Sequence, residues 1–143
     1  MELNQKPTRA FVMASWAATG IGVATYLVGL WNATALALSE KGFYIAVLTL
    51  GLYATISLSK AVRDKADGIP VTAAYLSISW AAFGIACALL VVGLWNAEVL
   101  LSEKGFYGLG FCLSIFGAMA VQKNMRDGDG DLSMPSLKRT TED

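Results

Sequence analysis

Two short sequence blocks decide the fold, and they occur together once in each half of the chain. Residues Gly29–Ala33 read Gly-Leu-Trp-Asn-Ala, and Ser39–Tyr44 follow as Ser-Glu-Lys-Gly-Phe-Tyr. The same two blocks return at Gly93–Ala97 and at Ser102–Tyr107. Each pair of blocks lies between two long apolar segments, which predicts that each pair forms the turn between two helices.

Four segments of the chain carry no charged side chain: residues 10–31, 43–59, 71–95 and 106–121. As an α-helix the first would be roughly 33 Å long, enough to cross a hydrocarbon core of roughly 30 Å. The second and fourth are shorter, and we expect these helices to continue into the basic residues that follow. Because a helix of a soluble protein needs a polar face, the sequence predicts an all-α membrane protein with four transmembrane helices.

The two halves of the chain align with each other over most of their length. Residues up to Ala33 match the second half at an offset of 64, whereas residues from Ser39 onward match at an offset of 63. An extra residue inside a packed helix would rotate all later side chains by roughly 100°. We therefore expect the residues between Ala33 and Ser39 to form a turn, with the flanking blocks in different helices.

The basic residues lie mainly on one side of this topology. Nine of the eleven lysines and arginines fall on the side of the chain termini, and only Lys41 and Lys104 fall on the other. By the positive-inside rule, both termini are expected in the cytoplasm. The predicted fold is therefore two tandem helical hairpins related by a pseudo-two-fold axis along the membrane normal. The expected segments are a cytoplasmic N-terminal segment at 1–9, a first hairpin at 10–64, a cytoplasmic linker at 65–70, a second hairpin at 71–127 and a flexible cytoplasmic tail at 128–143.

The chain resembles the YiaA/YiaB family of small bacterial inner-membrane proteins, whose repeated unit is called the YiaAB two-helix domain. The resemblance covers roughly residues 10–127. It is carried by the two repeated blocks and by the pattern Lys-x-x-Arg-Asp at 60–64 and 123–127. The resemblance implies a multi-pass protein of the inner membrane. It implies no activity, because the family offers no catalytic residues to carry over.

The repeated blocks supply the first group of candidate site residues, which we call the turn motif. Its aromatic residues are expected to anchor helix ends at the membrane surface. Its asparagines and serines are expected to cap helices, its glutamates to favour positive helix ends, and its glycines to admit a neighbouring helix. The alternative is a polar site for a zwitterionic solute or lipid headgroup. The turn motif comprises Trp31, Asn32, Ser39, Glu40, Lys41, Gly42, Tyr44, Trp95, Asn96, Ser102, Glu103, Lys104, Gly105 and Tyr107.

A second group of candidate site residues lies at the inner ends of the second and fourth helices. Lys60 and Arg63 are three residues apart, as are Lys123 and Arg126, so each pair shares one helix face. Anionic lipid headgroups are their expected partners. Docking of a protein partner is the alternative.

Small residues at helical spacing indicate where helices approach one another. Gly20 and Ala24 are four residues apart, and so are Gly84 and Ala88. Such spacing allows close contact between transmembrane helices. We expect the helices that contain these residues, the first and the third, to form a central pair.

The composition excludes several function classes. The chain has no histidine, which removes the most frequent metal ligand and the usual general base near neutral pH. Cys87 and Cys112 lie in apolar segments, where a thiol stays protonated and inert. Acidic and basic residues balance, so no bulk charge indicates nucleic acid as a partner. We expect no enzymatic activity, no cofactor and no metal site.

These observations predict a small multi-pass protein of the bacterial inner membrane. The favoured function is that of a non-enzymatic accessory or envelope-stress component, which acts through helix–helix contacts and forms a homo-oligomer. The alternative function is an oligomeric conductor of ions or small solutes. The lipid bilayer is the expected surrounding, and no protein partner can be named from the sequence.

Overall fold

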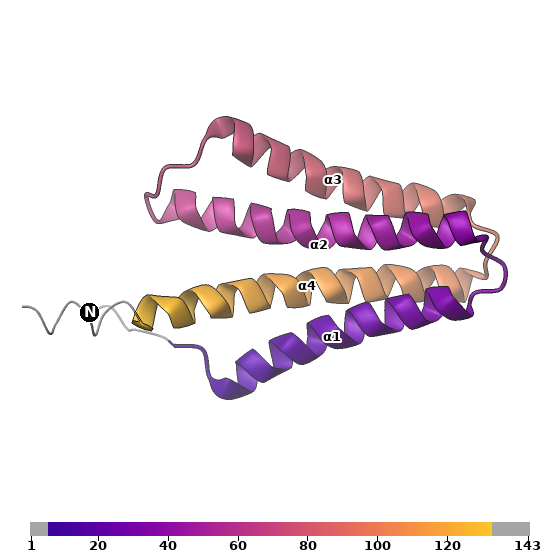
Figure 1. Ribbon diagram of the computed structural model, residues 1–143, viewed down its shortest axis with the longest axis horizontal. Coiled ribbons are helices and arrows are strands. Elements are labelled where there is room, and N and C mark those ends of the chain that lie inside the picture. Colours follow the sequence, from indigo (N-terminus) through magenta and orange to yellow (C-terminus); the bar gives the residue numbers. More distant parts are fainter. Residues whose placement is uncertain (1–5, 133–143) are drawn as a thin grey trace, which may run out of the picture.

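The computed structural model describes residues 6–132, and this part of the chain consists of four α-helices and their connections. The helices are α1 (Arg9–Asn32), α2 (Leu38–Ala66), α3 (Ala73–Asn96) and α4 (Leu101–Leu132). They run alternately up and down in one elongated bundle (Figure 1). All four are long and apolar enough to cross a membrane. The four predicted transmembrane helices are therefore confirmed.

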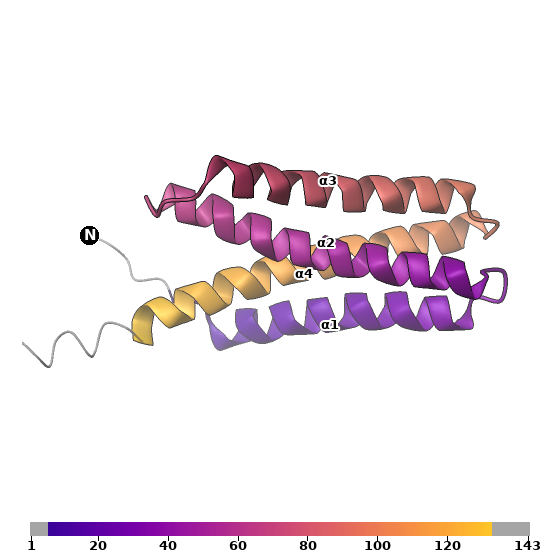
Figure 2. The same cartoon turned by 45° about the horizontal axis from the view of Figure 1, so that its top comes forward.

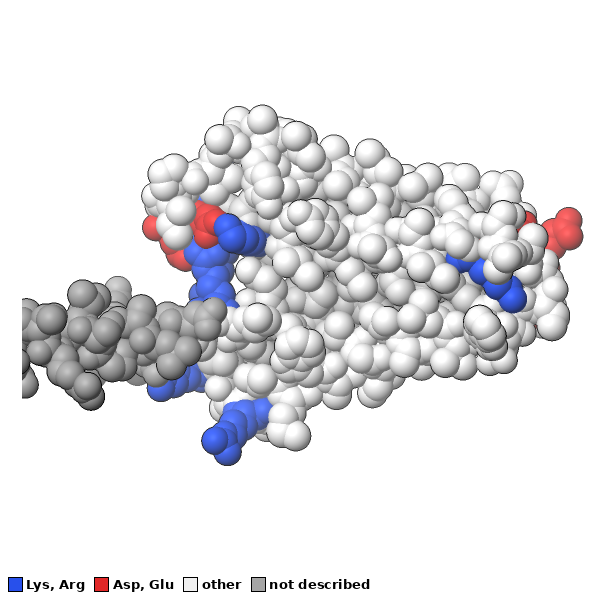
Figure 3. Space-filling model, in the orientation of Figure 1, with Lys and Arg blue, Asp and Glu red and all other residues white. Residues whose placement is uncertain are grey.

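Different parts of the chain lie at the two ends of the bundle. The connections α1–α2 and α3–α4 lie together at one end, which we call the turn end (Figure 1). The start of α1, the α2–α3 connection and the close of α4 lie at the opposite end, which we call the terminal end. On the face seen in Figure 3, lysine, arginine, aspartate and glutamate gather at these two ends, and the surface between them is uncharged. This distribution suits a bundle that crosses a hydrocarbon layer.

Local sequence signals explain the helix boundaries. The side chains of Thr8 and Thr72 accept hydrogen bonds of 3.2 Å from the backbone N–H groups three residues on, and so cap α1 and α3. Helix α2 ends before Gly68, whose φ of +77° is a left-handed conformation that glycine adopts without strain.

Helix α4 extends further than the sequence predicted. It continues through Leu132, whereas the second repeat was expected to end at residue 127. The rest of the predicted tail, residues 133–143, and the first five residues of the predicted N-terminal segment lie outside the described residues.

The two helices of one repeat are not each other's closest partners in space. α1 packs along α4 and α2 packs along α3, while α2 crosses α4 at the centre (Figure 2). The two helices of each repeat make few contacts with each other, and α1 makes none with α3. The expectation that the first and third helices form the central pair is therefore wrong. The central pair is α2 and α4.

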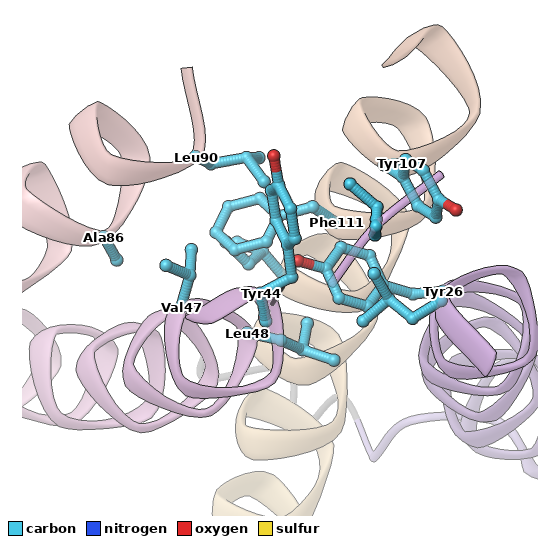
Figure 4. Packing of buried hydrophobic residues seen from close by; sticks show 11 residues of the cluster. Tyr26, Tyr44, Val47, Leu48, Ala86, Leu90, Tyr107 and Phe111 are labelled. Atoms are coloured by element: carbon cyan, nitrogen blue, oxygen red, sulfur yellow. Dashed lines mark hydrogen bonds between the residues drawn. The ribbon is translucent and has the colours of Figure 1, made fainter. Parts of the chain in front are cut away.

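The distribution of large side chains explains this arrangement. Tyr44 of α2 and Tyr107 and Phe111 of α4 are buried at the centre with Tyr26 of α1 (Figure 4). In the most apolar 18-residue windows, 39% of α2 and 44% of α4 are buried, against 17% in both α1 and α3. Tyr44 of α2 and Tyr107 and Phe111 of α4 are buried in the core, whereas the tryptophans of α1 and α3 are exposed. The outward faces of α1 and α3 are left apolar and exposed, as lipid contact requires.

Candidate functional site

The glutamates of the turn motif cap the helices that they begin. The Glu40 carboxylate accepts a hydrogen bond of 2.8 Å from the backbone N–H of Ala37, and the Glu103 carboxylate accepts one of 3.2 Å from that of Leu100. A carboxylate in the first turn also complements the positive end of the helix. Their predicted role at the positive helix ends is confirmed.

The serines of the turn motif do not cap these helices, so their prediction as N-caps is wrong. Ser39 and Ser102 lie inside the first turns of α2 and α4, because these helices begin at Leu38 and Leu101, the residues just before the serines. The glutamate side chain reaches back to the N–H group that precedes the helix, so no hydroxyl is needed there.

The lysines of the turn motif contact the preceding helix. The Lys41 ammonium donates to the Trp31 carbonyl at 3.4 Å, and the Lys104 ammonium donates to the Trp95 carbonyl at the same distance. A cation near the last carbonyl groups of a helix is favourable because these carry partial negative charge. Each Glu-Lys pair thus joins the start of one helix to the end of the one before it.

The asparagines of the turn motif were predicted to cap α1 and α3, but they are the last helical residues, and the C-caps are Ala33 and Ala97. The Asn32 amide donates to the Val28 carbonyl at 3.0 Å, and the Asn96 amide donates to the Val92 carbonyl at 2.9 Å. Each side chain therefore bonds to the carbonyl four residues back, within the last turn of its own helix.

The aromatic residues of the turn motif divide into two kinds. Trp31 and Trp95 are 84% and 82% exposed, which suits surface anchors. Tyr44 and Tyr107 were predicted as anchors too, but both are buried, and their rings stack at 6.3 Å with an interplanar angle of 15°. The prediction for the tyrosines is wrong because they lie on the faces of α2 and α4 that meet at the bundle centre.

Hydrogen bonds tie these tyrosines to neighbouring helices. The Tyr107 hydroxyl donates to the Gly29 carbonyl of α1 at 2.9 Å. The Tyr26 hydroxyl donates to the Tyr44 carbonyl of α2, also at 2.9 Å. The buried aromatic cluster is therefore cross-linked by polar contacts that stabilise the turn end.

The glycines of the turn motif are not helix contacts. No atom lies within 4 Å of where a Cβ would stand on Gly42 or Gly105. The expectation that they admit a neighbouring helix is wrong. Near these turns, other glycines make the close approaches: Gly29 of α1 lies against Phe106, and Gly93 of α3 lies against Phe43.

A small polar cavity of about 270 Å³ lies at the turn end between α2 and α3. Four of its lining residues are polar, and all four belong to the turn motif: Ser39, Glu40, Tyr44 and Asn96. The lining residues are Ser39, Glu40, Phe43, Tyr44, Gly93, Asn96 and Ala97. Residues of the first and second turn motifs therefore meet in space here.

At the terminal end, the basic residues of the second group pair with aspartates of the same chain. Lys60 contacts Asp64 at 3.1 Å, and Lys123 contacts Asp127 at 3.4 Å, each along its own helix. Arg63 of α2 pairs with Asp127 of α4. In the reverse sense, Arg126 of α4 pairs with Asp64 of α2 and also contacts Asp67 at 3.2 Å.

These aspartates were not among the site residues predicted from the sequence. The signal was present in the repeated Lys-x-x-Arg-Asp pattern, because a lysine four residues before an aspartate faces it along a helix. The contacts across the helices could not be read from spacing. Within the chain, Arg63 and Arg126 hold α2 to α4, while the two lysines pair within their own helices.

One further polar contact is buried between α1 and α4. The Asn124 amide donates to the Ser15 hydroxyl at 3.0 Å, and both residues are buried. The Asn124 carbonyl oxygen has no hydrogen-bond partner among the described residues. The repeat-related position in α2 is Ala61, so this contact exists on one side of the bundle only.

Metal ligands do not gather in the described part of the chain. Within residues 6–132, no three histidine, cysteine, aspartate or glutamate side chains are placed to hold a metal ion. Cys87 is half-buried and Cys112 is exposed, and both thiols are free.

Comparison with known proteins assigns the family. The model of the "yiaA/B two helix domain" matches residues 11–64 and again residues 75–127. The chain is 59% identical over 118 residues to "Inner membrane protein YiaA" of Escherichia coli (strain K12), covering 82% of this chain and 81% of that protein. It is 38% identical over 64 residues to "Uncharacterized membrane protein YubF" of Bacillus subtilis (strain 168), covering 45% of this chain and 74% of that protein. No solved structure matches the chain. With two copies of the domain, four apolar helices and a similar inner-membrane protein, the chain belongs to the YiaA/B two-helix-domain family of membrane proteins.

Proposed function

We propose that this protein is a non-enzymatic component of the bacterial inner membrane that acts through helix–helix contacts and assembles with further copies of itself. The observation that carries the proposal is an exposed face of small residues on each of the two outer helices. On α1 this face consists of Ala17, Gly20 and Ala24, and on α3 it consists of Ala81, Gly84 and Ala88.

These two faces are open in the single chain. No atom lies within 4 Å of where a Cβ would stand on Gly20 or Gly84. In lipid, helices associate through small residues that let two backbones approach closely. Each face therefore has the composition of a helix contact, while none of the helices within residues 6–132 covers it.

The proposal includes the predicted pseudo-two-fold relation between the repeats. Reciprocal contacts support it: Arg63 pairs with Asp127 as Arg126 pairs with Asp64. At the turn end, Phe106 and Tyr107 pack on Gly29 as Phe43 and Tyr44 pack on Gly93. Such a relation makes the faces of α1 and α3 equivalent, so each chain offers two similar contacts to its neighbours.

We also propose that both termini are cytoplasmic. The support is the surplus of basic residues at the terminal end, which includes Lys60, Arg63 and Lys65. Modification of single cysteines by a membrane-impermeant thiol reagent in intact cells tests this orientation. Labelling at the turn end and protection at the terminal end are expected, and the opposite pattern contradicts the proposal.

Subunit counting in liposomes tests the assembly. The wild-type chain is expected to form dimers or larger assemblies that dissociate as lipid is added. Gly20→Leu and Gly84→Leu are expected to weaken assembly, because the added side chain separates the two backbones. Gly105→Leu is the matched control, since Gly105 is also open but lies on α4 outside the proposed face.

Two results would contradict this assignment. One is a wild-type chain that is monomeric at every lipid dilution. The other is an assembly that Gly20→Leu and Gly84→Leu leave unchanged.

The alternative function, an oligomeric conductor, requires a path between chains. In the described residues, the centre of one bundle is filled by Tyr26, Tyr44, Tyr107 and Phe111. Flux of ions or small solutes into liposomes that carry the purified protein tests this alternative. Flux no greater than into empty liposomes would exclude it.

A further inference from the structure

Two grooves at the turn end occupy repeat-related positions. The first lies between α1 and α2 and has a volume of about 770 Å³, and the second lies between α3 and α4 and has a volume of about 490 Å³. Both volumes fall within the roughly 300–1,000 Å³ that is typical of sites for small ligands. The first is lined by Leu27, Leu30, Trp31, Leu38, Lys41, Gly42 and Ile45, and the second by Val91, Leu94, Trp95, Leu101 and Lys104.

The grooves follow from the way the helices pair. Each groove lies between the two helices of one repeat, which are joined by a short turn but pack mainly on the other repeat. The turn keeps the two helix ends near each other, and the packing partners hold the helices apart below it. A space between two transmembrane helices that no side chain fills is open to the bilayer.

The linings of both grooves are chemically alike. The walls are apolar, and an exposed tryptophan and a single lysine stand at each rim. Lys41 is the one charged residue of the first groove, and Lys104 is the one charged residue of the second. A single positive charge above apolar walls complements an amphiphile with an anionic head.

The neighbouring glutamates do not cancel this charge within the groove. Consecutive residues of a helix point roughly 100° apart. Glu40 accordingly lines the polar cavity toward α3, while Lys41 lines the groove toward α1. Lys41 donates one hydrogen bond, to Trp31, and an ammonium group has three donors, so two remain for a ligand.

We propose that each groove binds one anionic phospholipid, with the acyl chains along the apolar wall and the phosphate on Lys41 in the first repeat and on Lys104 in the second. A transmembrane helix of a second copy is the competing occupant. It fits less well, because its apolar surface would remove the lysine from water without supplying a counter-charge. An anionic phosphate supplies that charge at the depth where headgroups lie.

Tryptophan quenching by brominated phospholipid can test each groove separately. The full chain carries four tryptophans, and Trp31 and Trp95 line the grooves. Chains that retain only Trp31 or only Trp95, with phenylalanine at the other positions, report on one groove each. The chains are placed in vesicles that contain brominated phosphatidylglycerol or brominated phosphatidylcholine, with the bromine near the headgroup end of the acyl chains.

We expect phosphatidylglycerol to be preferred by about fivefold at both reporters, the factor that one cation near a membrane surface contributes. Lys41→Gln should abolish the preference at Trp31 and preserve it at Trp95, and Lys104→Gln should do the reverse. Lys41→Arg keeps the charge and should retain the preference. Lys65→Gln removes a lysine outside the grooves and should change neither reporter.

Three results would overturn the proposal. The first is equal quenching by the two lipids in the wild-type background. The second is a loss of preference at both reporters when one lysine is replaced, since this indicates a bulk surface charge. The third is protection of Trp31 and Trp95 from both lipids, since this indicates that another protein copy fills the grooves.

Discussion

The α1–α4 and α2–α3 interfaces use repeat-related positions but pack in different ways. A Cβ on Gly22 of α1 would stand 2.7 Å from the Ser114 backbone nitrogen of α4, and a Cβ on Gly117 of α4 would stand 2.7 Å from the Thr19 backbone nitrogen of α1. The corresponding residues of the other interface are Ala86 and Ala54. One interface therefore joins two backbones, and the other joins side chains.

A second difference concerns polar contacts. Ser15 and Ser79 both donate to the carbonyl four residues back in their own helices, but only Ser15 also accepts a buried bond, from Asn124, whose counterpart in α2 is Ala61. The α1–α4 interface is thus closer and more polar, and the α2–α3 interface is looser. One repeated sequence can thus give two interfaces that differ in how well they accept larger side chains, when a few positions change between glycine and larger residues.

The largest loss of stability should come from a side chain placed on a glycine where the backbones of α1 and α4 touch. Gly117→Ala is expected to lower the free energy of unfolding by about 2 kcal/mol, because the added methyl group meets the backbone of Thr19. The converse change in the looser interface, Ala54→Gly, should cost about 1.5 kcal/mol, through backbone entropy and the loss of one buried methyl group. Denaturant titration in mixed micelles, followed by circular dichroism, measures both values.

Gly108→Ala is the control for this prediction, because Gly108 lies on the same helix but is open. Alanine there should leave the stability unchanged or raise it. If Gly117→Ala were as stable as Gly108→Ala, the close contact between α1 and α4 would be disproved.

The next effect concerns the terminal end, where the two halves are alike. Asp64→Asn and Asp127→Asn each remove the negative charge that pairs with a partly buried arginine, and each should cost about 1–3 kcal/mol, between the values for surface and buried ion pairs. The two losses should be similar because the pairs are reciprocal. Unfolding of both variants at low and high salt measures them.

An exchange of charges provides the matching control. The double variant Arg63→Asp with Asp127→Arg should recover part of the stability that either single change loses. Purely additive losses would show that these two side chains do not interact across α2 and α4.

A smaller effect should separate the two tyrosines of the turn motif. Tyr107→Phe removes the hydroxyl that donates to the Gly29 carbonyl and should cost about 1 kcal/mol. Tyr44→Phe removes a hydroxyl that borders the polar cavity, so its cost should be lower. Equal losses of unfolding free energy would show that the hydroxyls of the two repeats have equivalent environments.

The smallest effect should appear at the helix starts. Glu40→Gln and Glu103→Gln weaken a cap and remove a favourable charge, with an expected cost of about 0.5 kcal/mol each at low salt. Glu40→Gln should lower the free energy of unfolding slightly more than Glu103→Gln, since the bond of Glu40 to the backbone is 2.8 Å long and that of Glu103 is 3.2 Å long. A salt series distinguishes the two contributions, because only the charge effect is screened.

Parts of the candidate site could be predicted because they depend on neighbours in sequence. The bond of Glu40 to the start of its own helix involves a residue three positions away, so residue type and order suffice to expect it. Burial of Tyr44 and Tyr107 could not be predicted in this way. A tyrosine near a helix end suits both a membrane surface and a core, and only the neighbouring helix decides between them.

The sequence by itself determined the number of helices, their capacity to cross a membrane and the presence of two repeats. These properties follow from the length of uncharged segments and from the repeated blocks, both of which act along the chain. Only the tertiary structure decided that α1 packs on α4 and α2 on α3, that the cations of the terminal end pair with aspartates across helices, and that a groove opens within each repeat. The physical reason is that four apolar helices in lipid have no polar face to orient them. Their partners are then chosen by the fit of glycine against backbone and of aromatic side chains against one another.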